Sequence, residues 1–180
     1  MVLTGARCIV RSWRTGDADA LVRHANNFEV ARQLRDRFPH PYTPADAAAF
    51  LRHATAQGAG GRSTNLAIEV DGEAAGGIGF VSGSDIERFS AEIGYWLGEQ
   101  YWGRGITTEA VLLVTAHALT AVNLLRLFAL PFADNTASRR VLEKAGYDCE
   151  GILRSSSVKY GQRRDQAMYA RVNETWTSGQ

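Results

Sequence analysis

Glu92 is a carboxylate in the middle of an apolar run, which makes it the first candidate for chemistry. If residues 88–97 form a strand, alternation turns Ala91, Ile93 and Tyr95 to one face and Glu92 to the other, beside Gly94. A glycine within a strand leaves room for another molecule to approach closely. Glu92 is then placed to act as a general base. The alternative is that it lies on the solvated face of an antiparallel sheet.

Asn135 and Ser138 lie at the start of a predicted helix. Asparagine is a preferred first residue, so Asn135 is expected to cap this helix. Ser138 shares a helix face with Val141, Leu142 and Ala145, which are typical core residues. A hydroxyl on that face must find a partner or cost about 1–3 kcal/mol in lost hydration. It either bonds back to a carbonyl of the preceding turn or belongs to a site.

A turn that contains two glycines follows the apolar run 93–97 and opens another predicted helix. In this layout successive backbone amides can converge on a phosphate, and the helix N-terminus adds partial positive charge. Glycine matters because a Cβ would block the close approach of the backbone. Two registers are possible, Gln100-x-x-Gly103-x-Gly105 and Trp102-x-x-Gly105-x-Thr107. We favour the second, because it puts Thr107 at the start of the helix.

Periodicity and turn residues place these candidates in an ordered series of strands and helices. Strands are predicted over residues 6–13, 65–70, 73–81, 88–97, 124–131, 147–155 and 166–172. Helices are predicted over 18–27, 30–37, from 43 onward, 107–121 and 135–145, with loops at 38–42 and 57–61. The run 124–131 lacks alternation and is expected to be buried on both faces. Asp71-Gly72 and a turn at 159–162 predict hairpins. The order predicts one α+β domain over residues 1–180.

Composition narrows the classes of function. The chain has 180 residues and a formal net charge of +1, which gives no electrostatic argument for binding nucleic acid or a membrane. Cys8 and Cys149 are too few for a disulfide framework or a metal cluster, and both are expected to be reduced. No apolar run approaches the roughly 20 residues of a membrane span. We therefore expect a cytoplasmic protein, monomeric or homodimeric, without a metal.

Three segments, 92–97, 101–110 and 135–147, together resemble the acetyl-CoA site of the GNAT superfamily of N-acetyltransferases, and more narrowly its RimJ/RimL branch. Glu150-Gly151 and the later Gly161…Arg164-Asp165 are also typical of that branch. The resemblance covers essentially the whole chain. It implies the GNAT fold: a single mixed, mostly antiparallel sheet of about seven strands, flanked by helices and splayed at the acetyl-CoA site.

The resemblance also implies an activity, the transfer of an acetyl group from acetyl-CoA to a primary amine by direct attack in a ternary complex. The amine would be a protein N-terminal α-amine or that of a small molecule. Glu92 would take its proton, and Ser138 would donate one to the leaving thiolate. Many GNAT enzymes use a tyrosine one turn later, where this chain has Leu142. Some RimL-like enzymes have a carboxylate between the positions of Gly151 and Gly161, where this chain has three serines, so a ribosomal-protein acceptor is not implied.

The remaining site residues follow from the same resemblance. The coenzyme would be held by the backbone of Tyr95, Trp96 and Leu97, by the turn Gly103, Arg104, Gly105, Ile106, Thr107 and Thr108, and by Asn135, Ser138 and Lys144. For Lys144, and for Arg139, the alternative is a solvated helix face. Phe38, His40 and Tyr42 would line the acceptor pocket. Two other functions stay open: a catalytically silent acyl-CoA sensor, and a dinucleotide-binding Rossmann domain, against which the antiparallel hairpins argue.

Overall fold

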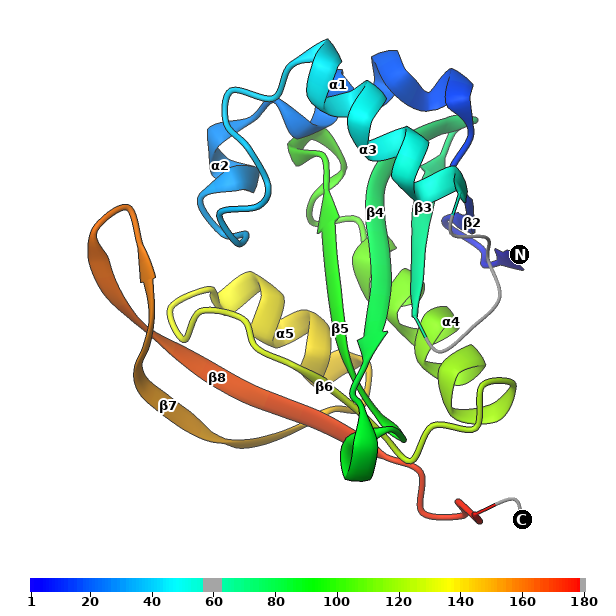
Figure 1. Ribbon diagram of the computed structural model, residues 1–180, viewed down its shortest axis with the longest axis vertical. Coiled ribbons are helices and arrows are strands. Elements are labelled where there is room, and N and C mark those ends of the chain that lie inside the picture. The colour runs from blue at the N-terminus through cyan, green and yellow to red at the C-terminus, as the bar shows by residue number, and fades with distance from the viewer. Residues whose placement is uncertain (57–62, 179–180) are drawn as a thin grey trace.

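The computed structural model describes residues 1–56 and 63–178, and the loop predicted at 57–61 lies outside them. Within the described residues, eight strands form one sheet in the order β1-β2-β3-β4-β5-β6-β8-β7 (Figure 1). The strands are β1 (Val2–Thr4), β2 (Ile9–Ser12), β3 (Thr64–Val70), β4 (Glu73–Ser82), β5 (Ser90–Leu97), β6 (Arg126–Ala129), β7 (Asp148–Lys159) and β8 (Gln162–Val172). The mixed sheet flanked by helices confirms the predicted fold class, with one strand more than expected.

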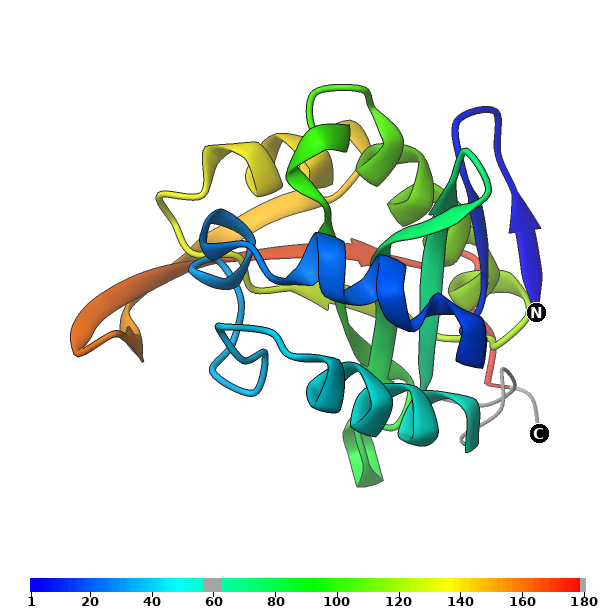
Figure 2. The same cartoon turned by 90° about the horizontal axis from the view of Figure 1, so that it is seen from above.

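Helices cover both faces of the sheet. They are α1 (Ala18–Ala25), α2 (Phe28–Ala31), α3 (Pro44–Ala56), α4 (Ile106–Thr120) and α5 (Thr136–Lys144). Figure 2 shows α4 in light green and α5 in yellow on one side, with α1 in blue and α3 in cyan on the other. Since alternate residues of a strand point to opposite faces, β5 contributes Tyr95 to the core under α4 and α5, and Trp96 to the core under α1 and α3.

The sheet opens between β5 and β6. These two strands are parallel, whereas the other neighbouring pairs in the described part of the chain are antiparallel. Their register begins at Ser90 and ends where Glu92 pairs with Phe128. Beyond Glu92, β5 continues alongside β4 as far as Leu97, while its other edge has no strand partner among the described residues. This is the splay that the resemblance implied.

The predicted strand 6–13 is present but shorter, as β2, because residues 5–8 form the turn of a hairpin with β1, a strand that was not predicted. The turn between these two strands is hydrogen-bonded to Glu109 of α4. The backbone N–H groups of Ala6, Arg7 and Cys8 donate to its carboxylate at 3.0, 2.7 and 3.0 Å. Burial by itself would raise the pKa of Glu109, but these bonds outweigh it and the pKa lies below its ordinary value. Cys8 is buried beside this carboxylate, and burial raises the pKa of its thiol to about 12.

Two other expectations also need correction. The helix predicted over 30–37 is only the four residues of α2, because Asn27 caps it early and accepts from Glu29 N at 2.8 Å. The bonds that follow are of the tighter i→i+3 kind, which end the helix before Arg35. The run 124–131 is not buried on both faces: β6 alternates between buried and half-buried residues, because one of its faces borders the opening of the sheet.

The hairpin of β7 and β8 is longer than predicted and reaches back towards the N-terminal helices (Figure 1). At its tip, the Tyr160 ring stacks on Phe28 of α2 with centroids 5.8 Å apart. Beside it, Lys159 Nζ is 2.8 Å from Asp36 Oδ1, and Lys159 is only 4% exposed. The hairpin therefore contacts the segment that follows α2.

Candidate active site

The predicted phosphate turn is a short loop between β5 and α4. Gly103 and Gly105 both have φ of +75°, a left-handed conformation that glycine adopts without a steric penalty. Gly105 is the N-cap of α4, so Ile106, Thr107 and Thr108 form its first turn. The N–H groups of a first turn have no partner inside the helix. A Cβ at Gly103 would meet no atom within 4 Å, so there is open space beside this glycine of the turn.

Two side chains hold this turn in place, and a third, Arg104, lies beside them. The indole of Trp102 donates to the carbonyl of Leu97 at 2.8 Å, which joins the turn to the end of β5. The Tyr101 hydroxyl donates to Glu73 of β4 at 2.8 Å. Arg104 lies 5.5 Å above the Tyr101 ring, with half of its side chain exposed. Its guanidinium forms an exposed ion pair with Asp71 at 3.9 Å, so it would have to leave this partner to reach an anion at the turn.

Ser138 is held between the cap of α5 and the core. Asn135 caps the helix as predicted, and its Oδ1 accepts from Ser138 N at 3.0 Å. The Ser138 hydroxyl does not bond back along the helix but lies 2.9 Å from the hydroxyl of Tyr95 on β5. Burial raises the pKa of Tyr95, so its phenol is neutral and can donate. When Tyr95 donates to Ser138 Oγ, the proton of the serine is left for another acceptor.

Glu92 lies at the last residue pair between β5 and β6, on the face opposite to Tyr95. Its carboxylate forms an ion pair with the guanidinium of Arg35, which follows α2. The Glu92 side chain is 29% exposed and that of Arg35 is 54% exposed. Gly94, two residues on, has open space where a Cβ would lie.

The predicted acceptor residues take different places around this face. Phe38 packs edge-on against Trp96, with ring centroids 5.5 Å apart. Tyr42 lies behind Phe38 at 5.2 Å and is buried, so it supports Phe38 from the core. His40 is exposed and lies 5.6 Å from Phe28, beside the tip of the β7–β8 hairpin. Phe38 borders the space at Gly94 most directly.

The two basic candidates on α5 differ. Arg139 donates to the hydroxyl of Tyr169 at 3.1 Å and to the carbonyl of Ala133 at 3.0 Å, so its guanidinium is engaged within the fold. Lys144 is exposed in the last turn of α5. Its side chain remains a candidate for contact with the coenzyme.

Comparison with known proteins assigns this arrangement to a family. The model of the acetyltransferase (GNAT) domain matches residues 7–148. The uncharacterized N-acetyltransferase p20 of Bacillus licheniformis is 30% identical over 165 residues, which cover 91% of this chain and 92% of that protein. The chain belongs to the GNAT acetyltransferase family.

Two further relatives support the RimJ/RimL-like character of this GNAT chain. The structure of Mycobacterium smegmatis RimJ in complex with CoA-disulfide superposes with a TM-score of 0.86 at 27% identity, covering 97% of this chain and 88% of that one. The ribosomal-protein-serine acetyltransferase of Escherichia coli is 33% identical over 97 residues, 53% of this chain and 54% of that protein. The predicted enzyme class, N-acetyltransferase, and the predicted cosubstrate, acetyl-CoA, are confirmed.

Sequence reasoning missed two partners in this GNAT site. The first is the hydroxyl of Tyr95, for which only a backbone role was predicted. A tyrosine on the core face of a strand needs a partner for its hydroxyl, and that signal points to a polar residue such as Ser138. The second is Arg35, for which no role was predicted. A carboxylate within a strand calls for a cation, but no local pattern links Arg35 to Glu92 across 57 positions.

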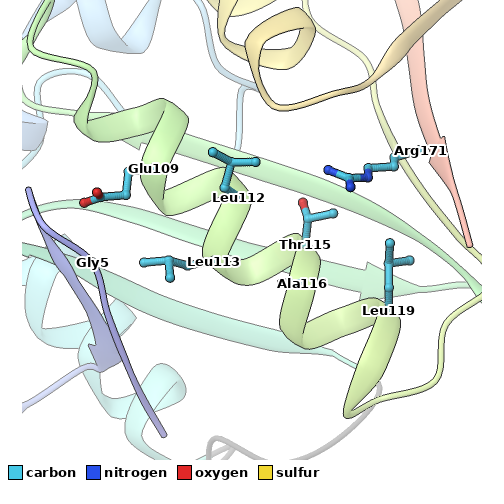
Figure 3. Close-up of a pocket in the computed structure, with 8 residues that line it drawn as sticks. All are labelled: Gly5, Glu109, Leu112, Leu113, Thr115, Ala116, Leu119 and Arg171. Atoms are coloured by element: carbon cyan, nitrogen blue, oxygen red, sulfur yellow. The ribbon is translucent and has the colours of Figure 1, made fainter.

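A depression of about 360 Å³ lies elsewhere on the molecule, along the outer side of α4 (Figure 3). Leu112, Leu113 and Leu119 line much of it. The charged residues near its ends are engaged within the fold: Glu109 holds the β1–β2 turn, and Arg171 donates to Ala145 O at 2.8 Å. We therefore assign no chemistry to this depression.

Other kinds of site were also considered for residues 1–56 and 63–178. No group of three or more histidine, cysteine or acidic side chains in these ranges is arranged to hold a metal ion. No helix there is both long and apolar enough to cross a membrane.

Proposed function

We propose that this GNAT enzyme acetylates a primary amine held at Glu92, by direct attack within a ternary complex. The observation that carries the proposal is the placement of Glu92 and Ser138 on the two sides of the open sheet. Glu92 faces the side covered by α1 and α3, while Ser138 reaches Tyr95 on the side covered by α4 and α5. The amine and acetyl-CoA would thus bind on opposite faces of the sheet, and the amine would meet the acetyl group at the opening between β5 and β6.

The residues around this opening fit acetyl-CoA. The amides of Ile106, Thr107 and Thr108 would hold the pyrophosphate at the positive end of α4. Arg104 and Lys144 add positive charge at two exposed positions. The unpaired edge of β5 would hold the pantetheine amides as an added strand does. Acetyl-CoA supplies the activated acetyl group: the carbon–sulfur bond breaks, a carbon–nitrogen bond forms, the amine loses a proton and the sulfur gains one.

Glu92 and Ser138 would handle these two protons. Glu92 takes the proton of the amine, directly or through water, and is paired with Arg35 before the amine binds. Ser138 donates its hydroxyl proton to the departing sulfur while its Oγ accepts from Tyr95. This arrangement serves either a protein N-terminal amine or a small-molecule amine, in a protein whose cytoplasmic location remains a prediction.

The test is a screen in which thiol release from acetyl-CoA is followed while amines and N-terminal peptides are added. We expect some amines to accelerate release, with the acetylated amine seen by mass spectrometry. Glu92→Gln should lower kcat/KM about 10²–10⁴-fold, the range for loss of a general base. Ser138→Ala should lower kcat more than it weakens the binding of the coenzyme.

Glu150→Gln is the matched control. Glu150 is also a strand carboxylate paired with an arginine, Arg126, but lies outside the proposed machinery. Its rates should match the wild type. If acetyl-CoA binds but no amine accelerates thiol release, the chain is an acyl-CoA sensor and the proposed catalysis is wrong. Unchanged rates in Glu92→Gln and Ser138→Ala would refute the assignment of these two roles.

A further inference from the structure

One turn of the chain, residues 35–38, contacts both residues that flank Gly94 on its face of β5. It is closed by a bond from Phe38 N to the Arg35 carbonyl at 2.9 Å. Its first residue, Arg35, forms the ion pair with Glu92, and its last, Phe38, packs on Trp96. We call residues 35–38 the acceptor turn. It borders the position where Glu92 would receive the amine.

The space between these two contacts is small. Glu92 and Trp96 are four residues apart on one strand, which corresponds to about 13 Å. Between them Gly94 has no atom within 4 Å of the position of a Cβ. This face of β5 therefore has open space at Gly94, between the ion pair at one end and the aromatic pair at the other.

The acceptor turn is also fixed from its other side. Asp36 forms an ion pair with Lys159 at the tip of the β7–β8 hairpin. Lys159 is 4% exposed and also lies 4.7 Å above the ring of Tyr160. Stacking of Tyr160 on Phe28 adds a second contact between the hairpin and the N-terminal segment. The tip of the hairpin thus holds the acceptor turn in place from the side away from β5.

We propose that the acceptor is a small primary amine with a carboxylate next to the amine, as in a free α-amino acid. Arg35 would bind the carboxylate and Glu92 the amine. This inference rests on the proposed function and names its substrate class. Because Arg35 and Glu92 are in direct contact, the two acceptor groups that replace this ion pair must be adjacent too. In an α-amino acid a single carbon separates them.

The charges of Arg35 and Glu92 explain why the acceptor needs a carboxylate as well as an amine. An ammonium group that arrives at Glu92 displaces Arg35 and leaves a guanidinium without its partner. A carboxylate on the same molecule restores that partner, and Arg binds carboxylates through two parallel hydrogen bonds. A polyamine would instead bring a second positive charge close to Arg35, which is unfavourable.

The experiment compares pairs of acceptors that share the amine and differ in the carboxylate. Free L-amino acids, their amides, spermidine and short peptides are assayed with the wild-type enzyme and acetyl-CoA. We expect kcat/KM for the best amino acid to exceed that for its amide by about tenfold or more, the effect of a charge-assisted bidentate pair. Arg35→Gln should reduce this ratio to about twofold or less, and Arg35→Lys should keep part of it.

The ratio of acid to amide is the decisive readout, because loss of Arg35 also removes the partner of Glu92 and slows every acceptor. Arg32→Gln is the matched control, since Arg32 is an exposed arginine of the same segment paired with Glu29. It should retain the wild-type ratio. Equal rates for acids and amides, or a preference for spermidine or peptides, would overturn this inference and leave the transferase function intact. If no amine at all were acetylated, the proposed function itself would fall.

Discussion

The hydroxyl of Tyr95 offers the sharpest test of how Ser138 is positioned. It lies 2.9 Å from Ser138 Oγ, while the tyrosine ring packs in the core under α4 and α5. Tyr95→Phe keeps the ring and removes this contact, together with the longer bond from the hydroxyl to the carbonyl of Ser138 at 3.3 Å. A neutral hydrogen bond contributes about 1 kcal/mol net. Since about 1.4 kcal/mol of barrier corresponds to a factor of ten in rate, we expect kcat to fall about fivefold.

The assay is steady-state thiol release with the best acceptor, measured across a range of pH. The KM values for coenzyme and acceptor should not change, because Tyr95→Phe leaves the phosphate turn and Glu92 in place. The shape of the pH profile should also persist, since burial raises the pKa of Tyr95 and its phenol stays protonated throughout. Tyr147→Phe is the matched control: it too loses one buried hydroxyl contact, at 2.7 Å from Thr115, but does not touch Ser138.

A double-mutant cycle decides whether Tyr95 acts through Ser138. In the Ser138→Ala background, Tyr95→Phe should have almost no further effect on kcat. If the two effects multiply instead, Tyr95 does not work through the serine. An equal loss of kcat in Tyr147→Phe would show that the effect comes from general loosening of the core. Either result would refute the proposed positioning role.

Two predictions concern the turns around the site. Glu109→Gln should cost about 2–3 kcal/mol of unfolding free energy, because three backbone N–H groups lose a charged acceptor. The pKa of Glu109 is lowered from 4.5 in the folded state. The wild type therefore has the full stabilisation above pH 4.5 and loses it as the pH falls through the lower pKa of the folded state. The stability difference between wild type and variant in denaturant titrations should shrink below pH 4.5, and a constant difference would contradict the assignment. Gly105→Ala forces an L-residue into φ of +75°, which costs about 1–2 kcal/mol and should raise the KM for acetyl-CoA. Gly16→Ala is the control, because a Cβ there meets no atom within 4 Å, and it should change neither the unfolding free energy nor the KM for acetyl-CoA. If both variants raised the KM equally, a specific role for the turn would be refuted.

Short-range patterns were sufficient to predict several parts of the site. Asn135 caps α5 because a side-chain amide at a helix start meets free N–H groups only a few residues away. The glycine turn before α4 is equally local, since both glycines need left-handed backbone angles. The hairpin of β1 and β2 was missed for the opposite reason. It depends on Glu109, which lies about a hundred positions later in the chain.

By itself, then, the sequence determined the family, the glycine turn before α4 and the identities of Glu92 and Ser138 as candidates. These depend on residue types at fixed spacing, which a linear chain displays directly. Only the tertiary structure decided their partners: Tyr95 for Ser138, Arg35 for Glu92, and Lys159 for the acceptor turn. Each of these contacts joins residues that are 43 to 123 positions apart. Such pairs meet only when strands and helices pack, and no periodicity in the sequence records which side chains will then face each other.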